Sequence, residues 1–310
     1  MTVQVVHAAI TTSAEFNFTS SDGLRIAYRR WDSRGPVRGV IQIAHDMGEH
    51  IQRYGEFIDA LVSAGVTVYG NDHRGHGLTA SSAKQFGDFG KGGFELLVED
   101  MVRLSRIARD ENPNLPFILF GHGMGSFAAQ QYVLDHSREL DALILSGSGA
   151  LDGLARVATS APEDSNVLNA NFEPARTPFD WLSRDTGVVD ALMNDPLCFA
   201  ELQPKAFASF LAAASELSDP LRLRDIRDDL PIYLFSGSED PIGQQLEGLA
   251  LLIHRYQKAG LYDISHDFYL GGRHEMLNEI NREEVRERLL AWISSMLEGS
   301  AYRPGNSTAA

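Results

Sequence analysis

The segment GHGMGS, residues 121–126, lies where a chain could carry a catalytic nucleophile. It follows an apolar run, PFILF (116–120), and precedes a helical pattern, FAAQQYVLDH (127–136). An apolar strand, a tight glycine turn and a helix form the setting of the nucleophile elbow G-x-S-x-G, whose third position holds the attacking serine. Here the third position is Gly123, which has no side chain to attack a carbonyl. The motif therefore predicts the backbone of an elbow without its nucleophile.

Two further side chains lie where such an elbow would need an acid and a base. Asp240 lies in SGSEDPIG, after the predicted strand PIYLFSG, and His274 lies in GGRHEMLNE, after the predicted strand ISHDFYL. A histidine can take the proton of a nucleophile, and a carboxylate fixes its tautomer and stabilises the imidazolium. In α/β-hydrolases the order along the chain is nucleophile, acid, histidine, each on a loop after a strand. Each residue alone could be an ordinary loop residue, but together with Gly123 they predict a catalytic site, with Asp240 orienting His274.

The loop AHDMGEHIQRY, residues 44–54, follows the predicted strand GVIQIA and should lie beside the elbow. In this fold, one backbone N–H from that loop and one from the residue after the nucleophile form the oxyanion hole. The candidate donors are the N–H groups of Met47 and Met124, and the sequence predicts that both are present. Asp46 brings a carboxylate to the same place. It would oppose an oxyanion if it pointed inward and be harmless if it pointed outward, and the sequence is compatible with both orientations.

Short apolar runs recur along the chain at a spacing typical of alternating strands and helices. Several are apolar almost throughout, as strands buried on both faces should be. They predict an α/β fold with a mostly parallel sheet covered by helices on both faces. The expected strands are 24–31, 39–44, 66–72, 116–122, 142–147, 231–237 and 264–270, and helical stripes follow residues 54–62, 94–104 and 279–297. The turn NDHRGHG (71–77) is expected to brace the site loops through Asp72 and Arg74.

The alternation breaks between residues 151 and 229, which have few strand patterns. We interpret the chain as a core in two parts, 1–150 and 230–298, with a helical cap at 151–229 and a flexible tail at 299–310. Because ligands of open α/β sheets bind at the carboxyl ends of the strands, the cap should cover the substrate there. The alternative is an extra helical layer with no role in substrate access.

Three aromatic residues of the predicted cap, Phe179, Trp181 and Phe210, are candidates for the mouth of an apolar pocket that ends at Gly123. Such side chains suit an acyl chain, although many cap residues must simply pack on the core.

Composition narrows the possible partners. The net charge of −15 leaves no basic patch for nucleic acid or an anionic membrane surface. The single cysteine, Cys198, excludes internal disulfides and cysteine-rich metal sites. The apolar runs are too short to cross a bilayer, and the N-terminus lacks the basic region of a secretory signal. We expect a soluble, cytoplasmic protein with no stable membrane insertion and no metal.

AHDMGEHIQRY, NDHRGHGLT, GHGMGS, SGSEDPIG and GGRHEMLNEINREE together resemble the monoacylglycerol lipase and lysophospholipase-like branch of the α/β-hydrolases, also labelled serine aminopeptidase-like. The resemblance covers residues 15–297. It implies an eight-stranded sheet with a helical cap, a small or lipid-like carboxylic ester as substrate, and no cofactor. The chain departs from the family pattern twice: the family has serine at position 123 and usually glycine at position 46.

Three explanations of Gly123 remain open. The first, favoured by the intact Asp240 and His274, is an ester hydrolase inactivated by an engineered serine-to-glycine change. The second is a natural protein that uses His274 and Asp240 as a general base without covalent catalysis. The third is a binding module that keeps the pocket and has lost the chemistry. From the sequence alone, Gly123→Ser is expected to create or restore esterase activity.

Overall fold

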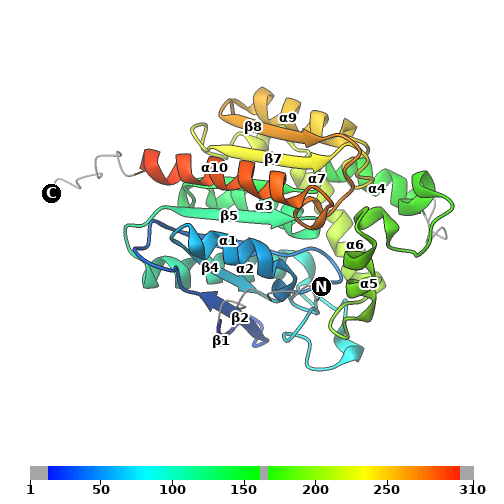
Figure 1. Cartoon of the computed structure of the whole chain (residues 1–310), viewed down its shortest axis with the longest axis horizontal. Coiled ribbons are helices and arrows are strands. Elements are labelled where there is room, and N and C mark those ends of the chain that lie inside the picture. The colour runs from blue at the N-terminus through cyan, green and yellow to red at the C-terminus, as the bar shows by residue number, and fades with distance from the viewer. Residues whose placement is uncertain (1–12, 161–166, 301–310) are drawn as a thin grey trace, which may run out of the picture.

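The apolar runs form the interior of one eight-stranded sheet, shown in Figure 1. The computed structural model describes residues 13–160 and 167–300. The strand order is β1-β2-β4-β3-β5-β6-β7-β8, and only β2 runs against the others. The strands are β1 (Ala14–Thr19), β2 (Arg25–Trp31), β3 (Gly39–Ala44), β4 (Val66–Asn71), β5 (Phe117–His122), β6 (Ala142–Ser146), β7 (Ile232–Gly237) and β8 (Ile264–Tyr269). The predicted α/β-hydrolase fold is confirmed.

The central strands are apolar throughout because helices cover both faces of the sheet. Every residue of β3 to β7 is buried. Side chains that alternate along a strand point to opposite faces, so Val40 joins one apolar core and Ile41 the other. This burial on both faces is what the uninterrupted apolar runs predicted.

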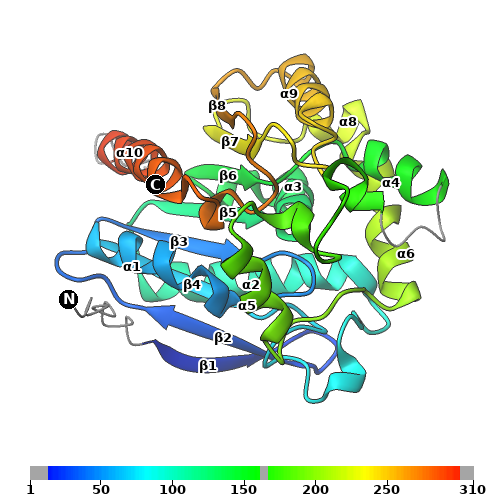
Figure 2. The same cartoon turned by 45° about the vertical axis from the view of Figure 1, so that its right-hand side comes forward.

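The helices form two layers, visible together in Figure 2. Side chains of α2, α3 and α9 pack on one face of the sheet, and those of α1 and α10 pack on the other. The helices of these layers are α1 (Gly55–Ser63), α2 (Gly93–Glu111), α3 (Met124–His136), α9 (Glu247–Ala259) and α10 (Arg282–Ser300).

Between β6 and β7 the described residues contain no strand. They form α4 (Leu151–Ser160), α5 (Thr186–Asn194), α6 (Pro204–Ala212), α7 (Ala214–Leu217) and α8 (Pro220–Leu223), with short 3-10 turns. This segment contacts the loops at the carboxyl ends of the strands, since the Phe199 N–H donates to the Gly48 carbonyl and the His274 N–H to the Trp181 carbonyl. The segment expected to be a cap therefore lies at the carboxyl edge of the sheet (Figure 2).

Strand β1 is the one strand of the described sheet that the apolar pattern missed. Five of its six residues are exposed, and it pairs with β2 at the edge of the sheet, so it lacks an apolar signature. The expected tail begins inside α10, which extends to Ser300; residues 301–310 and 1–12 lie outside the described part of the chain. Within that part, no helix is long and apolar enough to cross a membrane.

The turn after β4 is held by buried polar side chains, as the sequence predicted. The Asp72 carboxylate accepts hydrogen bonds from the N–H groups of Ile51 and Leu78. The fully buried Arg74 guanidinium donates to Asp100 at 2.9 Å and to Asp22 at 3.1 Å. These contacts connect the turn to α2 and to the loop after β1.

We expect Arg74→Met to destabilise the protein by about 3–5 kcal/mol, because it leaves the buried Asp100 carboxylate without its partner. Arg74→Lys, which keeps the charge but not the planar fork, should fall between Met and wild type. Urea unfolding followed by circular dichroism measures both. A methionine variant within about 1 kcal/mol of wild type would show that Arg74 is not a structural tie.

Candidate active site

The turn between β5 and α3 has the backbone of a nucleophile elbow. Gly123 has φ 53° and ψ −122°, a conformation that side chains rarely adopt and that an elbow imposes on its third residue. Its N–H donates to the Ser146 carbonyl at 3.0 Å, and its carbonyl accepts from the Ser126 N–H at 2.9 Å. The turn therefore projects position 123 toward the carboxyl edge of the sheet, although no side chain is present there.

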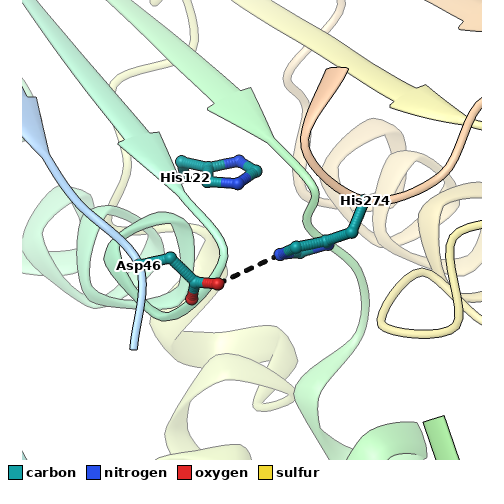
Figure 3. A group of neighbouring side chains, drawn as sticks. All are labelled: Asp46, His122 and His274. Atoms are coloured by element: carbon teal, nitrogen blue, oxygen red, sulfur yellow. Dashed lines mark hydrogen bonds and ion pairs between the residues drawn. The ribbon is translucent and has the colours of Figure 1, made fainter. Parts of the chain in front are cut away.

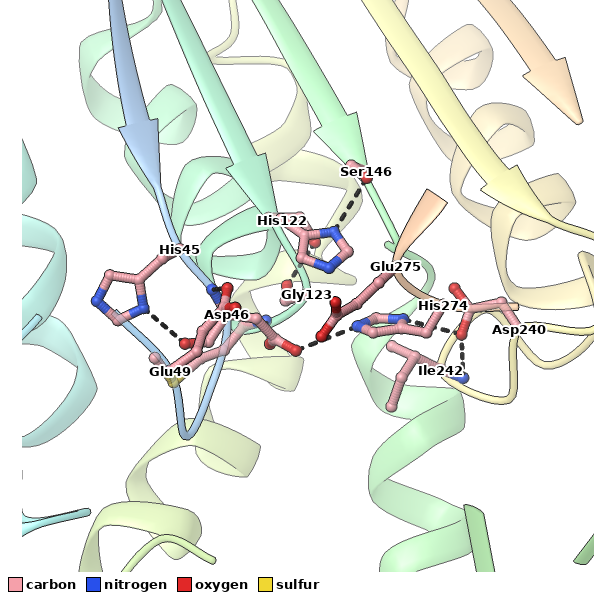
Figure 4. Close-up of polar contacts among 12 residues, drawn as sticks. His45, Asp46, Glu49, His122, Gly123, Ser146, Asp240, Ile242, His274 and Glu275 are labelled. Atoms are coloured by element: carbon pink, nitrogen blue, oxygen red, sulfur yellow. Dashed lines mark hydrogen bonds and ion pairs between the residues drawn. The ribbon is translucent and has the colours of Figure 1, made fainter. Parts of the chain in front are cut away.

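The side chain of Asp46 occupies the space that a residue at position 123 would need. A Cβ built on Gly123 would overlap the Asp46 carboxylate. Oδ1 of that carboxylate accepts a hydrogen bond from the Met124 N–H at 2.5 Å, and Oδ2 lies 3.1 Å from Nε2 of His274 (Figure 4). Asp46 therefore points inward, and its carboxylate occupies the Met124 N–H that the sequence offered as an oxyanion donor.

His274 also contacts the predicted acid. Its Nδ1 lies 3.0 Å from Oδ1 of Asp240, and both side chains are fully buried. The Ser236 hydroxyl donates to Oδ2 of Asp240 and the Ile242 N–H to Oδ1, so the carboxylate is held on both oxygens. The sequence-predicted pair of Asp240 and His274 is thus brought together beside Gly123.

The two carboxylates keep His274 protonated. Burial alone would lower the pKa of His274, but the charges and hydrogen bonds of Asp240 and Asp46 raise it well above its ordinary value. Burial would raise the pKa of Asp46, but the hydrogen bond and charge of His274 hold it below the ordinary range. The geometry therefore favours an imidazolium between two carboxylates, in which both ring nitrogens can donate.

His122 is a neighbour that the sequence reasoning missed. Its ring lies 4.7 Å from that of His274, centroid to centroid, and its Nδ1 lies 3.0 Å from the Ser146 hydroxyl. Burial and the positive charge of His274 lower the pKa of His122 to about 4, so it is neutral at pH 7. Its place inside the elbow motif was the signal that could have identified it.

Asp46, His122 and His274, drawn in Figure 3, offer ligand atoms that all lie within 4.8 Å of one another. A carboxylate and two imidazoles suit zinc. Here, however, the His274 Nε2 proton bridges directly to Asp46, so a metal would first have to displace that proton. Asp46 and His274 are therefore a hydrogen-bonded pair, with the His122 ring packed beside His274.

A second group of possible metal ligands consists of His50, Asp195 and Cys198. His50 Nε2 lies 2.9 Å from Asp195 Oδ2, and burial raises the pKa of the Cys198 thiol to about 12. Because metals bind the thiolate, the protonated Cys198 is a poor ligand. The Cys198 side chain itself is half-buried.

An ion-pair network supports the loop that carries Asp46. The Asp46 N–H donates to Oε1 of Glu49 at 2.8 Å. Arg53 pairs with Glu49 and donates to both carboxylate oxygens of Glu275 at 2.9 and 3.0 Å. Glu275 follows His274, so Arg53 ties the Asp46 loop to the His274 loop. Spacing along the chain could not reveal this contact across 222 residues.

The remaining predicted site residues occupy different environments. Met47 is half-buried, and its N–H makes no hydrogen bond to the described residues, so its expected role as an oxyanion donor stays a prediction. The Trp181 ring lies 5.0 Å from His274 and forms a wall of the site, whereas Phe179 is half-buried nearby in the chain. Phe210 is not at a mouth: only 2% exposed, it packs on Phe94 and Phe127 and joins α6 to the core.

Comparison with known proteins is consistent with this geometry. The family model described as serine aminopeptidase, S33, matches residues 35–281. A monoacylglycerol lipase of Mycolicibacterium smegmatis is 30% identical over 93% of this chain and 99% of its own length, and the human monoglyceride lipase is 25% identical over 90% and 89%. A highly thermostable carboxyl esterase from Bacillus coagulans, solved in complex with glycerol, superposes with a TM-score of 0.82 at 28% identity, over 92% of this chain and 99% of that one.

We expect Asp46→Asn to lower the pKa of His274, because the amide removes one of the two charges that hold its proton. Side-chain ¹⁵N NMR of the histidines across pH 5 to 9 measures the change. Asp135→Asn, at a surface carboxylate paired with Arg222, is the control and should leave the titration unaltered. If the pKa of His274 were the same in Asp46→Asn and Asp135→Asn, the contact between Asp46 and His274 would be contradicted.

The same proton predicts how stability changes with pH. The native pKa of His274 lies above the ~6.5 of an unfolded histidine, so the native state holds a proton that the unfolded chain releases. The free energy of unfolding should therefore fall as pH rises from about 6.5 through the native pKa. The pKa values of four other histidines are lowered, so these residues change the free energy of unfolding only below about pH 6.5. They are His45, His73, His76 and His122. Urea unfolding between pH 6.5 and 8.5 tests the sign, and Asp46→Asn should flatten the slope; a rising curve in wild type would contradict it.

Proposed function

Because the chain belongs to the serine aminopeptidase S33 family, we propose that it has the ester-binding site of a carboxylic ester hydrolase of the monoacylglycerol lipase type, in which a carboxylate has replaced the serine hydroxyl. It binds small apolar or lipid-like esters but does not cleave them through an acyl-serine. The similarity to a monoacylglycerol lipase over nearly the whole of both chains supports the substrate class. The family label, serine aminopeptidase, does not imply that this chain cleaves peptides.

One observation carries the proposal: Asp46 and Gly123 fit each other. The Asp46 carboxylate reaches His274 and the Met124 N–H only because position 123 has no Cβ. A lone serine-to-glycine change would explain Gly123 but would not explain Asp46. The fit therefore favours a natural pair of substitutions over an engineered inactivation.

The protonation of His274 separates the proposal from the alternative in which His274 and Asp240 act as a general base without covalent catalysis. A general base must accept a proton, and an imidazolium flanked by Asp46 and Asp240 already holds one. The charges of the site thus count against His274 activating water directly in the resting protein. The same charges are compatible with a site that only binds substrate, and with a site in which His274 donates a proton.

We expect the double variant Asp46→Gly/Gly123→Ser to be an active esterase, whereas Gly123→Ser alone should be nearly inert. In the single variant the serine side chain meets the Asp46 carboxylate, which also occupies the Met124 donor. Removing that charge from the oxyanion hole should raise kcat about 10²-fold or more over the single variant. Hydrolysis of p-nitrophenyl butyrate and of a monoacylglycerol, with fluorophosphonate labelling, measures the effect.

Two controls accompany the double variant. Asp46→Gly alone provides an empty site with no nucleophile and should stay inert and unlabelled. Adding His274→Ala to the double variant should abolish labelling, because the serine then has no base. A folded double variant that is neither labelled nor active would refute the ester hydrolase proposal, as would strong serine-directed labelling of the wild type.

A further inference from the structure

The two oxygens of the Asp46 carboxylate have different surroundings. Oδ1 accepts from the Met124 N–H at 2.5 Å, and Oδ2 faces the His274 Nε2 at 3.1 Å. The Asp46 side chain remains 13% exposed, whereas His274 and Asp240 are fully buried. A ligand at the edge of the sheet therefore meets Asp46 first.

We propose that Asp46 is itself a nucleophile, whose Oδ2 attacks a saturated carbon of an apolar epoxide to form an aspartyl ester that water then hydrolyses. This inference rests on the proposed function only in taking the same site and its apolar wall. Carboxylates serve as nucleophiles in covalent catalysis when they are held ionised and oriented. Asp46 meets both conditions, since His274 keeps it ionised and Glu49 holds its backbone N–H.

The occupied Met124 donor argues for a saturated carbon in place of an ester carbonyl. Attack on a carbonyl creates an oxyanion that needs the oxyanion donors, and Asp46 Oδ1 already takes one of them. Attack on a saturated carbon creates no such oxyanion. The opening of an epoxide leaves an alkoxide, which needs a proton, and the Nε2–H of His274 faces the point of attack.

The first step balances within the site. A bond forms from Oδ2 of Asp46 to an epoxide carbon, and the bond from that carbon to the ring oxygen breaks. The electron pair goes to the ring oxygen, which takes the Nε2 proton of His274. The products are a hydroxyalkyl ester of Asp46 and a neutral imidazole.

Esterification then converts His274 from an acid into a base. The ester has no charge, so Asp240 is the one carboxylate that still supports the imidazole. His274 takes a proton from water, and the hydroxide adds to Cγ of Asp46. The oxyanion forms on Oδ1, which already accepts the Met124 N–H. Collapse breaks the bond from Cγ to the former Oδ2, and the leaving alkoxide takes the second proton of water to give the diol. The first proton stays on His274, so the site returns to an imidazolium beside a carboxylate.

The wall beside this reaction is aromatic. The Trp181 ring lies 5.0 Å from His274, and Trp181 also accepts the His274 backbone N–H through its carbonyl. An aryl-substituted epoxide such as styrene oxide matches this wall and serves as the probe. The overall reaction adds one water to the epoxide and needs no other reactant.

Isotope labelling of the wild-type protein tests the source of the product oxygen. With enzyme in excess over styrene oxide in H₂¹⁸O, the diol of the first turnover should contain no ¹⁸O, because its new oxygen comes from Asp46. After many turnovers, the peptide that contains Asp46 should carry ¹⁸O. The peptide that contains Asp240 is the internal control and should stay unlabelled. A first-turnover diol with ¹⁸O, or no diol at all, would overturn the proposal.

Trapping the ester provides an independent readout. With 1-bromohexane the leaving bromide needs no proton, so His274→Gln should still alkylate but should not hydrolyse the ester. Peptide mass spectrometry should find the hexyl ester on Asp46 and none on Asp240. Asp46→Asn, which keeps the shape, should form no adduct and should lower diol formation by about 10⁴-fold or more. If Asp46→Gly/Gly123→Ser is an esterase but the wild type forms neither adduct nor diol, the proposed function stands and the nucleophile proposal fails.

Discussion

The arrangement of the site depends on one imidazolium shared between two carboxylates at the buried edge of the sheet. His274 lies 3.0 Å from Asp240 and 3.1 Å from Asp46, and the second contact exists because Gly123 leaves its space empty. This bridge of His274 between Asp46 and Asp240 favours the protonated His274 and the ionised Asp46. It also places the Asp46 carboxylate on the Met124 N–H. A serine in the same backbone would overlap the Asp46 carboxylate that now faces His274.

The scaffold around the bridge holds these groups in place with buried charge. Arg53 pairs with Glu49 under the Asp46 loop and with Glu275 beside His274, all three side chains being at most 10% exposed. Removing one member of a buried pair typically costs about 3–5 kcal/mol, more than an exposed pair contributes. The two loops that supply the bridge are therefore fastened to each other beneath the site as well as through Asp46 and His274.

Much of this structure could be predicted from the sequence, and the failures have physical causes. Strands β5 and β6 could be predicted from the sequence, because helices on both faces of the sheet require apolar residues at every position of these strands. Asp240 could be predicted because it follows such a strand, β7, and His274 because it follows β8, although β8 is only partly buried. The orientation of Asp46 was not, because it depends on the missing side chain of a residue on another loop. Phe210 was misplaced for a similar reason: an aromatic residue of a cap can face the core or the ligand, and its partners Phe94 and Phe127 decide which.

The missing Cβ at Gly123 has a consequence for how such a site can arise. Serine at position 123 and an inward aspartate at position 46 exclude each other sterically, whereas glycine at both positions leaves the cavity without a reactive group. The two positions therefore show sign epistasis, because the effect of an aspartate at 46 depends on which residue stands at 123. An evolutionary path that avoids the crowded combination introduces Gly123 before Asp46, and the reverse path must remove the aspartate first. A related sequence with serine at position 123 should therefore lack an inward aspartate at position 46.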